Sequence, residues 1–418
     1  MIRRLPLFIM AFVFAIAIAS SSWAPSWARE PGGGEPEIIR ELLDGIATNF
    51  GHRPTYERIE QAGSDIIIHK LSLLPKEASG GETGSLMVER TLLANPRKDD
   101  GGLWLIDRVE ASNIEFHATR ERNGKTEHLH VTAPKILLTG ASMLPRAAAR
   151  NGMERVNAGE LIANSASIPS ITIKAHDIPE ELHILDLKGS WEGDRRTGMG
   201  KGMFDLGKLV LPASLVSKGS GDKTLEELGY EKLTLNLLVK FNGHWDDKKR
   251  AHFDLSVRLG ALEAGMSELE IVDLALPLAL LEELADGKKS DEMAERIVGN
   301  PANELKDVTI KGMRISWIDN SLTGRLIPLL ARKQGMDPKA YAANISVYPQ
   351  LLLMQIGLPQ LAAQASEEIK KFVAEPRSLS VSFAAKAPMS FATMFTLLSD
   401  PAGLADTLGL KIEANTLK

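Results

Sequence analysis

Apolar and polar residues alternate, with a period of two, along most of the chain from Gly51 to about Leu274. The pattern is clearest in two neighbouring stretches, residues 233–241 and 253–261, in which apolar side chains occupy almost every second position. This alternation predicts an antiparallel hairpin with one apolar face and one polar face. Each predicted strand is about nine residues long, whereas five or six are typical, so we expect a tall, twisted sheet.

Helical periodicity flanks this region on both sides. Before it, apolar residues recur at helical spacing from Pro36 to about Asn49, and Pro36 suits the first helical turn, where its missing N–H is harmless. After it, a helix is predicted over residues 278–285, between Pro277 and Gly287.

The last part of the chain mixes short helices with strands. Capping aspartates before a first-turn proline predict two helix starts, and three glycines predict helix ends: Asp337-Pro338, Asp400-Pro401, Gly335, Gly357 and Gly409. Alternation predicts strands over residues 308–318, 379–385 and 410–414.

Together these elements predict a β-dominated α+β fold. Its main part is a long antiparallel meander sheet, curled or groove-like, and its C-terminal α+β part contains short helices. The change in character near residue 300 predicts three segments, namely a signal peptide over residues 1–28, a β-rich body over residues 29–300 and the C-terminal part over residues 301–418.

A short motif occurs twice in the β-rich body. Gly189-Ser190-Trp191-Glu192 leads through a turn to Phe204-Asp205-Leu206, and Gly243-His244-Trp245-Asp246 leads likewise to Phe253-Asp254-Leu255. One interpretation is that two hairpins converged on similar strand and turn residues. The other is a duplicated hairpin in a sheet that grows by addition, and two copies leave both open.

The first 28 residues predict export. Arg3 and Arg4 precede an apolar run from Leu5 to Ala19, which is short for a bilayer span, and Ser26-Trp27-Ala28 provides small residues for cleavage. We therefore expect a periplasmic protein whose signal peptide is cleaved near Ala28. The alternative is an N-terminal anchor in the inner membrane.

Composition narrows the classes of function. The 418 residues contain no cysteine, which excludes disulfides, thiolate metal sites and a cysteine nucleophile. The net charge of -5 and an aromatic content of 5% argue against nucleic acid as a partner. Motifs for phosphate loops, serine-hydrolase elbows and zinc-protease helices do not occur, so we expect no enzyme and no cofactor.

One group of residues could still bind a metal ion. Asn123-Gly124 predicts a tight hairpin turn, and the resulting register pairs His117 with His130. His117, His128 and His130 then share one face, with Glu115 beside them, so three imidazoles could meet a zinc ion. The simpler interpretation is the solvated face of a half-buried hairpin, and a shift of one residue in register would separate the histidines.

A hydrophobic ligand is the other candidate for binding. The apolar face of the clearest hairpin carries seven candidate ligand-binding residues: Leu235, Leu237, Val239, Phe241, Phe253, Leu255 and Val257. Basic residues at two turn tips, Arg195-Arg196 and Lys248-Lys249-Arg250, either contact anionic lipid headgroups or are simply solvated. The leucine- and methionine-rich helices around residues 351–361 and 389–398 form core or an apolar wall for a ligand.

Two resemblances extend this interpretation. The segments Ser316–Leu322, Ala374–Leu379 and Leu408–Asn415 resemble the C-terminal region of exported alphaproteobacterial proteins with no assigned function. The meander of long strands with one apolar face is similar in style to AsmA-like and other groove-forming lipid-transfer proteins. This resemblance implies a lipid carrier and implies no catalytic residue.

We therefore expect a non-enzymatic periplasmic protein that binds or transfers lipid or another hydrophobic ligand in the cell envelope. The alternative is a structural protein without a ligand, which docks an envelope protein or a membrane surface. A third candidate is a metal-dependent hydrolase that uses the histidine face.

Overall fold

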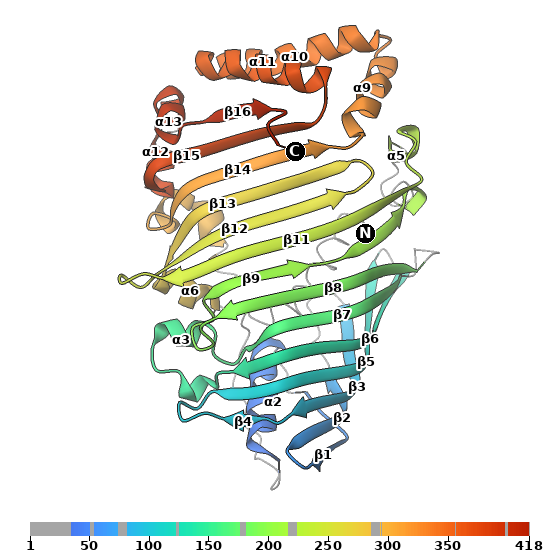
Figure 1. Ribbon diagram of the computed structural model, residues 1–418, viewed down its shortest axis with the longest axis vertical. Helices are drawn as coiled ribbons and strands as arrows, with labels where there is room; N and C mark the ends of the chain where they lie inside the picture. Colours follow the sequence, from blue (N-terminus) through green and yellow to red (C-terminus); the bar gives the residue numbers. More distant parts are fainter. Residues whose placement is uncertain are drawn as a thin grey trace. The chain divides into compact units, whose positions relative to one another are not determined.

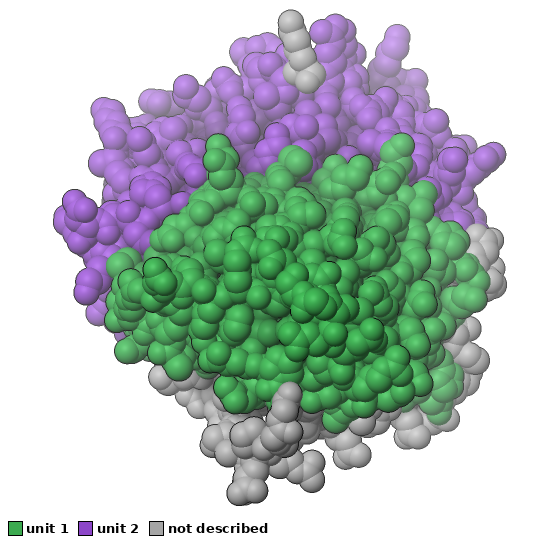
Figure 2. Space-filling model, turned by 60° about the horizontal axis from the view of Figure 1, so that its bottom comes forward, with its two compact units in different colours: residues 1–209, 278–295 green, residues 210–277, 296–418 purple. Residues whose placement is uncertain are grey.

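The computed structural model describes residues 35–50, 54–73, 82–122, 125–175, 181–215, 224–285, 293, 295–355, 357–397 and 400–417 (Figure 1). The predicted signal peptide lies outside these residues. The backbone forms two compact units, unit 1 with residues 1–209 and 278–295, and unit 2 with residues 210–277 and 296–418 (Figure 2). The boundary near residue 300 rests on sequence character and stays a prediction.

Unit 1 is built on an antiparallel meander. Its strands are β1 (Arg58–Ala62), β2 (Asp65–Leu73), β3 (Glu82–Ala94), β4 (Arg97–Lys98), β5 (Trp104–Arg122), β6 (Lys125–Met143), β7 (Leu161–Ala175), β8 (Leu182–Gly193), β9 (Gly200–Asp205) and the start of β10 (Lys208–Pro212). They are hydrogen-bonded in the order β1-β2-β3-β5-β6-β7-β8, with β4 on β5, and with β9 and the start of β10 on β8. β5 and β6 have 19 residues each, so the predicted long strands are confirmed.

Helix α2 (Glu37–Phe50) covers one face of this sheet, as its apolar spacing predicts. Ile39 and Leu43 are fully buried against Ile68 and Ile106, and Figure 1 shows the helix crossing the strands. Unit 1 also includes η1 (Arg146–Ala148), α3 (Gly152–Val156) and the predicted α6 (Leu278–Ala285), which contacts α3.

Unit 2 continues the same style of architecture. Its strands are β11 (Lys232–Trp245), β12 (Arg250–Ala261), β13 (Gly265–Pro277), β14 (Thr309–Asp319), β15 (Ser378–Ser390) and β16 (Lys411–Ala414), each antiparallel to the next. The predicted hairpin is β11–β12, with Val239 opposite Val257. Its strands have 14 and 12 residues and so exceed the predicted nine.

Several short helices complete unit 2. They include α5 (Thr224–Glu227), α8 (Pro301–Glu304), α9 (Leu322–Lys333), α10 (Pro338–Gln355), α11 (Pro359–Ala374), α12 (Phe391–Leu397) and α13 (Pro401–Leu408). The predicted start of α13 is confirmed, since the Asp400 side chain accepts a hydrogen bond from the Gly403 amide. Its predicted end is confirmed by Gly409, whose φ of 63° is left-handed. Among the described residues, no helix combines the length and apolarity needed to cross a bilayer.

The repeated motif forms two equivalent hairpins. Gly189 lies opposite Phe204 in β8–β9, and Gly243 lies opposite Phe253 in β11–β12. The glycine and the phenylalanine of the motif are therefore cross-strand partners in both copies. Duplication and convergence both fit this pairing.

Helix α11 covers the free edge of the outer strand, β16. The Gln364 amide of α11 donates a hydrogen bond to the Ile412 carbonyl at 3.2 Å, and the Glu368 carboxylate accepts one from the Ala414 amide at 2.8 Å. These two side chains, one helical turn apart, bond main-chain groups that a further strand would otherwise pair.

Candidate functional site

The seven predicted ligand-binding residues share one face of β11 and β12. Directly opposed residues of an antiparallel pair point to the same side, and Val239 lies opposite Val257 and Phe241 opposite Leu255. Leu237 is buried, and the other six are half-buried. Whether they bind a ligand stays a prediction.

The same face continues across unit 2. Val257 lies opposite Leu269 of β13, Leu269 opposite Ile315 of β14, and Ile315 opposite Val381 of β15. Leu259 on β12 belongs to the same side, two residues from Val257. We call these residues of β11–β15 the unit 2 apolar face. Its most exposed members are 53%, 50% and 47% accessible to solvent: Leu259, Ile315 and Val381.

The opposite side of the same strands is polar and more deeply buried at two positions. Ser316 follows Ile315 and is only 2% exposed, and Ser380 precedes Val381 and is 3% exposed. A half-buried strand ordinarily directs its aliphatic side inward and its polar side to water. At these positions β14 and β15 do the reverse.

One end of the unit 2 apolar face is covered by the chain itself. Phe383 and Ile310 pack with Leu408 of α13, and partly buried residues of α12 join them. A separate pocket of about 210 Å³ lies between α11 and α13, lined by Leu358, Leu361, Gln364, Asp406 and neighbouring residues. Ligand pockets are typically about 300–1,000 Å³, so this one is small for a lipid.

The histidine face has the predicted register. His117 lies opposite His130, Thr119 opposite His128, and Arg122 opposite Lys125. The turn residues Asn123-Gly124 lie outside the described residues. The register thus brings two of the three predicted histidines into direct contact.

Glu115, His117 and His130 form a potential metal-ligand group, and their ligand atoms all lie within 4.8 Å of one another. The rings of His117 and His130 stack with centroids 4.2 Å apart and 11° between their planes. The His117 Nε2 and the Glu115 Oε2 are 3.6 Å apart. His128 shares this face but is not part of the group.

His130 has an unusual environment. Its Nε2 is buried and has no hydrogen-bond partner among the described residues. Burial is the main cause that lowers the pKa of His130. His117 and Lys174 also lower it, and the opposing effect of Glu115 does not cancel them. The Lys174 amine is bound to Glu181 at 2.7 Å. At neutral pH the His130 imidazole is therefore uncharged.

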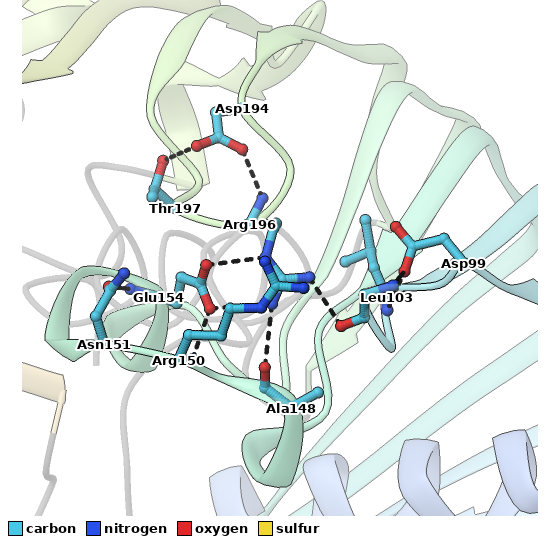
Figure 3. Close-up of polar contacts among 10 residues, drawn as sticks. Asp99, Leu103, Ala148, Arg150, Asn151, Glu154, Asp194, Arg196 and Thr197 are labelled. Atoms are coloured by element: carbon cyan, nitrogen blue, oxygen red, sulfur yellow. Dashed lines mark hydrogen bonds and ion pairs between the residues drawn. The ribbon is translucent and has the colours of Figure 1, made fainter.

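The basic turn after β8 is not a free surface. Arg196 is largely buried, and its guanidinium donates to both oxygens of Glu154 at 2.9 and 3.0 Å, to the Gly101 carbonyl at 3.1 Å and to the Ala148 carbonyl at 3.0 Å (Figure 3). The hydrogen bond from Arg196 holds the pKa of the Glu154 carboxyl below its usual value, against the opposing effect of burial.

Arg195 of the same turn, and Arg250 at the turn between β11 and β12 of unit 2, also donate hydrogen bonds to the protein. Arg195 donates to the Gly140 carbonyl and to Asn164, and Arg250 donates to Thr309 at 2.7 Å. The interpretation as a solvated tip is therefore wrong for the largely buried Arg196. Lys248 and Lys249 are exposed, and contact of these turns with lipid headgroups stays a prediction. The partners of the arginines are distant in sequence, and only the fold reveals them.

His252 of unit 2 belongs to a polar cluster that no sequence motif indicated. The His252 ring lies between two carboxylates, with Nδ1 2.6 Å from Asp273 and Nε2 3.1 Å from Asp246. Burial lowers the pKa of His252, but the hydrogen bonds to Asp273 and Asp246 outweigh it, and the net pKa is raised. Two bonded carboxylates fix the ring and leave neither nitrogen free.

Helix α10 carries an exposed apolar surface. Along its C-terminal half, five large apolar side chains are exposed: Val347, Tyr348, Leu351, Leu352 and Met354. We call these residues the α10 patch. The interpretation of this stretch as core is therefore wrong for Leu351, Leu352 and Met354. The chain carries no Asp, Glu, Lys or Arg from residue 340 to residue 366.

A family model described as "Uncharacterized protein" matches residues 254–415. The match spans β12 to β16 and therefore includes most of the unit 2 apolar face and the α10 patch. No curated protein matches the chain.

Proposed function

We propose that the protein is a non-enzymatic carrier whose unit 2 apolar face holds the acyl chain of a lipid or a similar hydrophobe. The observation that carries the proposal is the reversed orientation of β14 and β15. Ile315 and Val381 are half exposed, whereas the adjacent Ser316 and Ser380 are buried.

Simple energetics support a hydrophobic occupant. Full burial of a valine, leucine or isoleucine side chain is worth about 1.5–3 kcal/mol. Leu259, Ile315 and Val381 each have about half of this gain still available. An acyl chain that covers them would thus gain a few kcal/mol before its other contacts are counted.

The α10 patch supports action at a membrane. An apolar surface within a stretch of 27 residues free of Asp, Glu, Lys and Arg can enter the headgroup region without burying a charge. A carrier needs such a surface where it loads or releases its ligand.

The proposed location is the periplasm. Arg3, Arg4 and the apolar run of residues 5–19 support export, with cleavage near Ala28. The similarity in style to AsmA-like lipid-transfer proteins, and to exported alphaproteobacterial proteins, supports the same assignment by analogy of fold.

The test is ligand binding by the purified full-length protein. Native mass spectrometry with solvent extraction should reveal copurified lipid, and the delipidated protein should bind the fluorescent fatty acid cis-parinaric acid saturably. The double variant Ile315→Gln/Val381→Gln should weaken this binding at least about tenfold, or about 1.4 kcal/mol.

The control is Val272→Gln. Val272 is about as exposed as Ile315 and lies on the other side of β13, where it pairs with Gly312. Equal losses in the control and the double variant would argue against the face. A protein without lipid and without saturable binding would contradict the carrier and leave docking to an envelope protein.

A further inference from the structure

The hairpin β5–β6 places three metal-binding side chains at one point of a sheet face. Glu115 and His117 are two residues apart on β5 and therefore point to the same side, and His130 lies directly opposite His117 on β6. Their ligand atoms lie within 4.8 Å of one another. In a tetrahedral zinc site with bonds near 2.0–2.1 Å, ligand atoms are about 3.4 Å apart. Rotation of the part-exposed Glu115 and His117 side chains can bring the ligand atoms from within 4.8 Å to this shorter separation.

A bound cation would give the unpaired Nε2 of His130 a partner. The buried Nε2 of His130 has no partner among the described residues, and an unpaired buried polar atom is destabilising. Lys174, which lies opposite His130 on β7, forms an ion pair with Glu181 at 2.7 Å.

We propose that Glu115, His117 and His130 bind a divalent transition-metal ion, with Zn²⁺ as the ion that two imidazoles and one carboxylate fit. Three protein ligands leave a fourth position for water. The ion ties β5 to β6 in unit 1. This proposal is independent of the carrier function, because none of its ligands belongs to unit 2.

The third ligand differs between the sequence pattern and the structure. The pattern predicts His128 as the third ligand, whereas in the structure Glu115 lies within reach of both His117 and His130. Substitution of each in turn therefore tests the geometry itself.

The experiment titrates the metal-stripped full-length protein with Co²⁺, followed by visible absorption, and with Zn²⁺, followed by calorimetry. The wild type should bind one equivalent and give the intense absorption of tetrahedral Co²⁺. Glu115→Gln, His117→Ala and His130→Gln should each weaken binding at least about tenfold. His128→Ala should keep binding within about twofold.

A matched control is His183→Ala, since His183 bonds to Thr172 at 3.2 Å and is not a member of the group. Circular dichroism of every variant shows whether the sheet is intact. If His130→Gln fails to fold, His117→Ala still tests the site, because it changes an exposed side chain. Absence of saturable Zn²⁺ binding to the wild type would overturn the proposal. Loss with His128→Ala but not with Glu115→Gln would overturn the ligand set.

Discussion

Arg196 joins three segments of unit 1 that are far apart in sequence. Its guanidinium bonds to Gly101 before β5, to Ala148 of η1 and to Glu154 of α3. The Glu154 carboxylate also accepts the Arg150 amide at 2.7 Å, so neither charge is left without hydrogen bonds. A largely buried ion pair of this kind is stable only while both partners remain.

Arg196→Met should therefore lower the free energy of unfolding by about 3 kcal/mol, because it leaves Glu154 buried and unpaired. Urea denaturation measures this loss. Arg195→Met, which removes two exposed or part-buried hydrogen bonds, should cost about 1 kcal/mol. Adding Glu154→Gln to Arg196→Met should recover part of the loss. Equal losses in the two single variants would show that Arg196 has no special role.

Glu160 gives unit 1 a dependence on pH. Burial raises the pKa of its carboxyl from 4.5 to about 8. Between these values the folded state keeps a proton that the unfolded state releases, so this residue makes stability fall as the pH rises from 4.5 to 8. Glu160→Gln should remove that contribution. Its unfolding free energy should exceed that of the wild type increasingly up to pH 8 and should approach it near pH 4.5. A difference that is constant with pH would contradict the raised pKa.

Among the elements, α11 and β16 form a contact that sequence patterns do not describe. Gln364 and Glu368 bond the outer strand through side chains. The hydrogen bond from Lys371 and that from the Ala414 amide hold the pKa of Glu368 below its usual value, so it is ionised at neutral pH.

The double variant Gln364→Ala/Glu368→Ala should lose about 2 kcal/mol of stability, at about 1 kcal/mol for each hydrogen bond. It should also self-associate as its concentration rises, because an uncovered edge strand pairs with other chains. Denaturation and analytical ultracentrifugation measure the two effects. Glu367→Ala, at the adjacent exposed position, is the control and should change neither.

The elements themselves were largely predictable. The alternation of apolar and polar residues predicted β11, β12 and β15. The Asp400-Pro401 pair and Gly409 predicted where α13 begins and ends. Alternation defines two sides of a strand, but it does not say which side the rest of the chain covers. The exposure of Ile315 therefore required the structure. The burial of Arg196 did too, because its partner Glu154 is 42 residues away.

In the candidate sites, too, strand pairing was predictable from sequence, whereas side-chain contacts were not. The pairing of His117 with His130 followed from one turn signal. That the ligand atoms of Glu115, and not those of His128, lie near both rings depends on side-chain positions, which the turn signal does not give. His252 binds Asp246, six residues away in the same hairpin, but its second partner, Asp273, is 21 residues away on the next strand and could not be inferred from local sequence.

At the scale of the whole molecule, the proposed carrier needs to meet a membrane. The α10 patch should provide this contact, and its lack of charged residues predicts binding that depends little on salt. Sedimentation with phosphatidylcholine vesicles should recover the wild-type protein, and Leu351→Glu/Leu352→Glu should reduce the bound fraction severalfold. Val298→Glu, at a fully exposed apolar position outside the patch, should bind like the wild type. Binding that disappears in high salt would contradict an apolar contact.

The reversed strands β14 and β15 also determine which substitutions the isolated chain tolerates. A larger side chain at Ser316 or Ser380 meets a packed neighbourhood, whereas a polar one at Ile315 or Val381 meets water. A mutational scan that scores folding alone should therefore rank the serines as demanding and the aliphatic residues as replaceable. A scan that scores function in the cell should reverse that ranking, and the difference between the two maps would outline the surface on which the protein works.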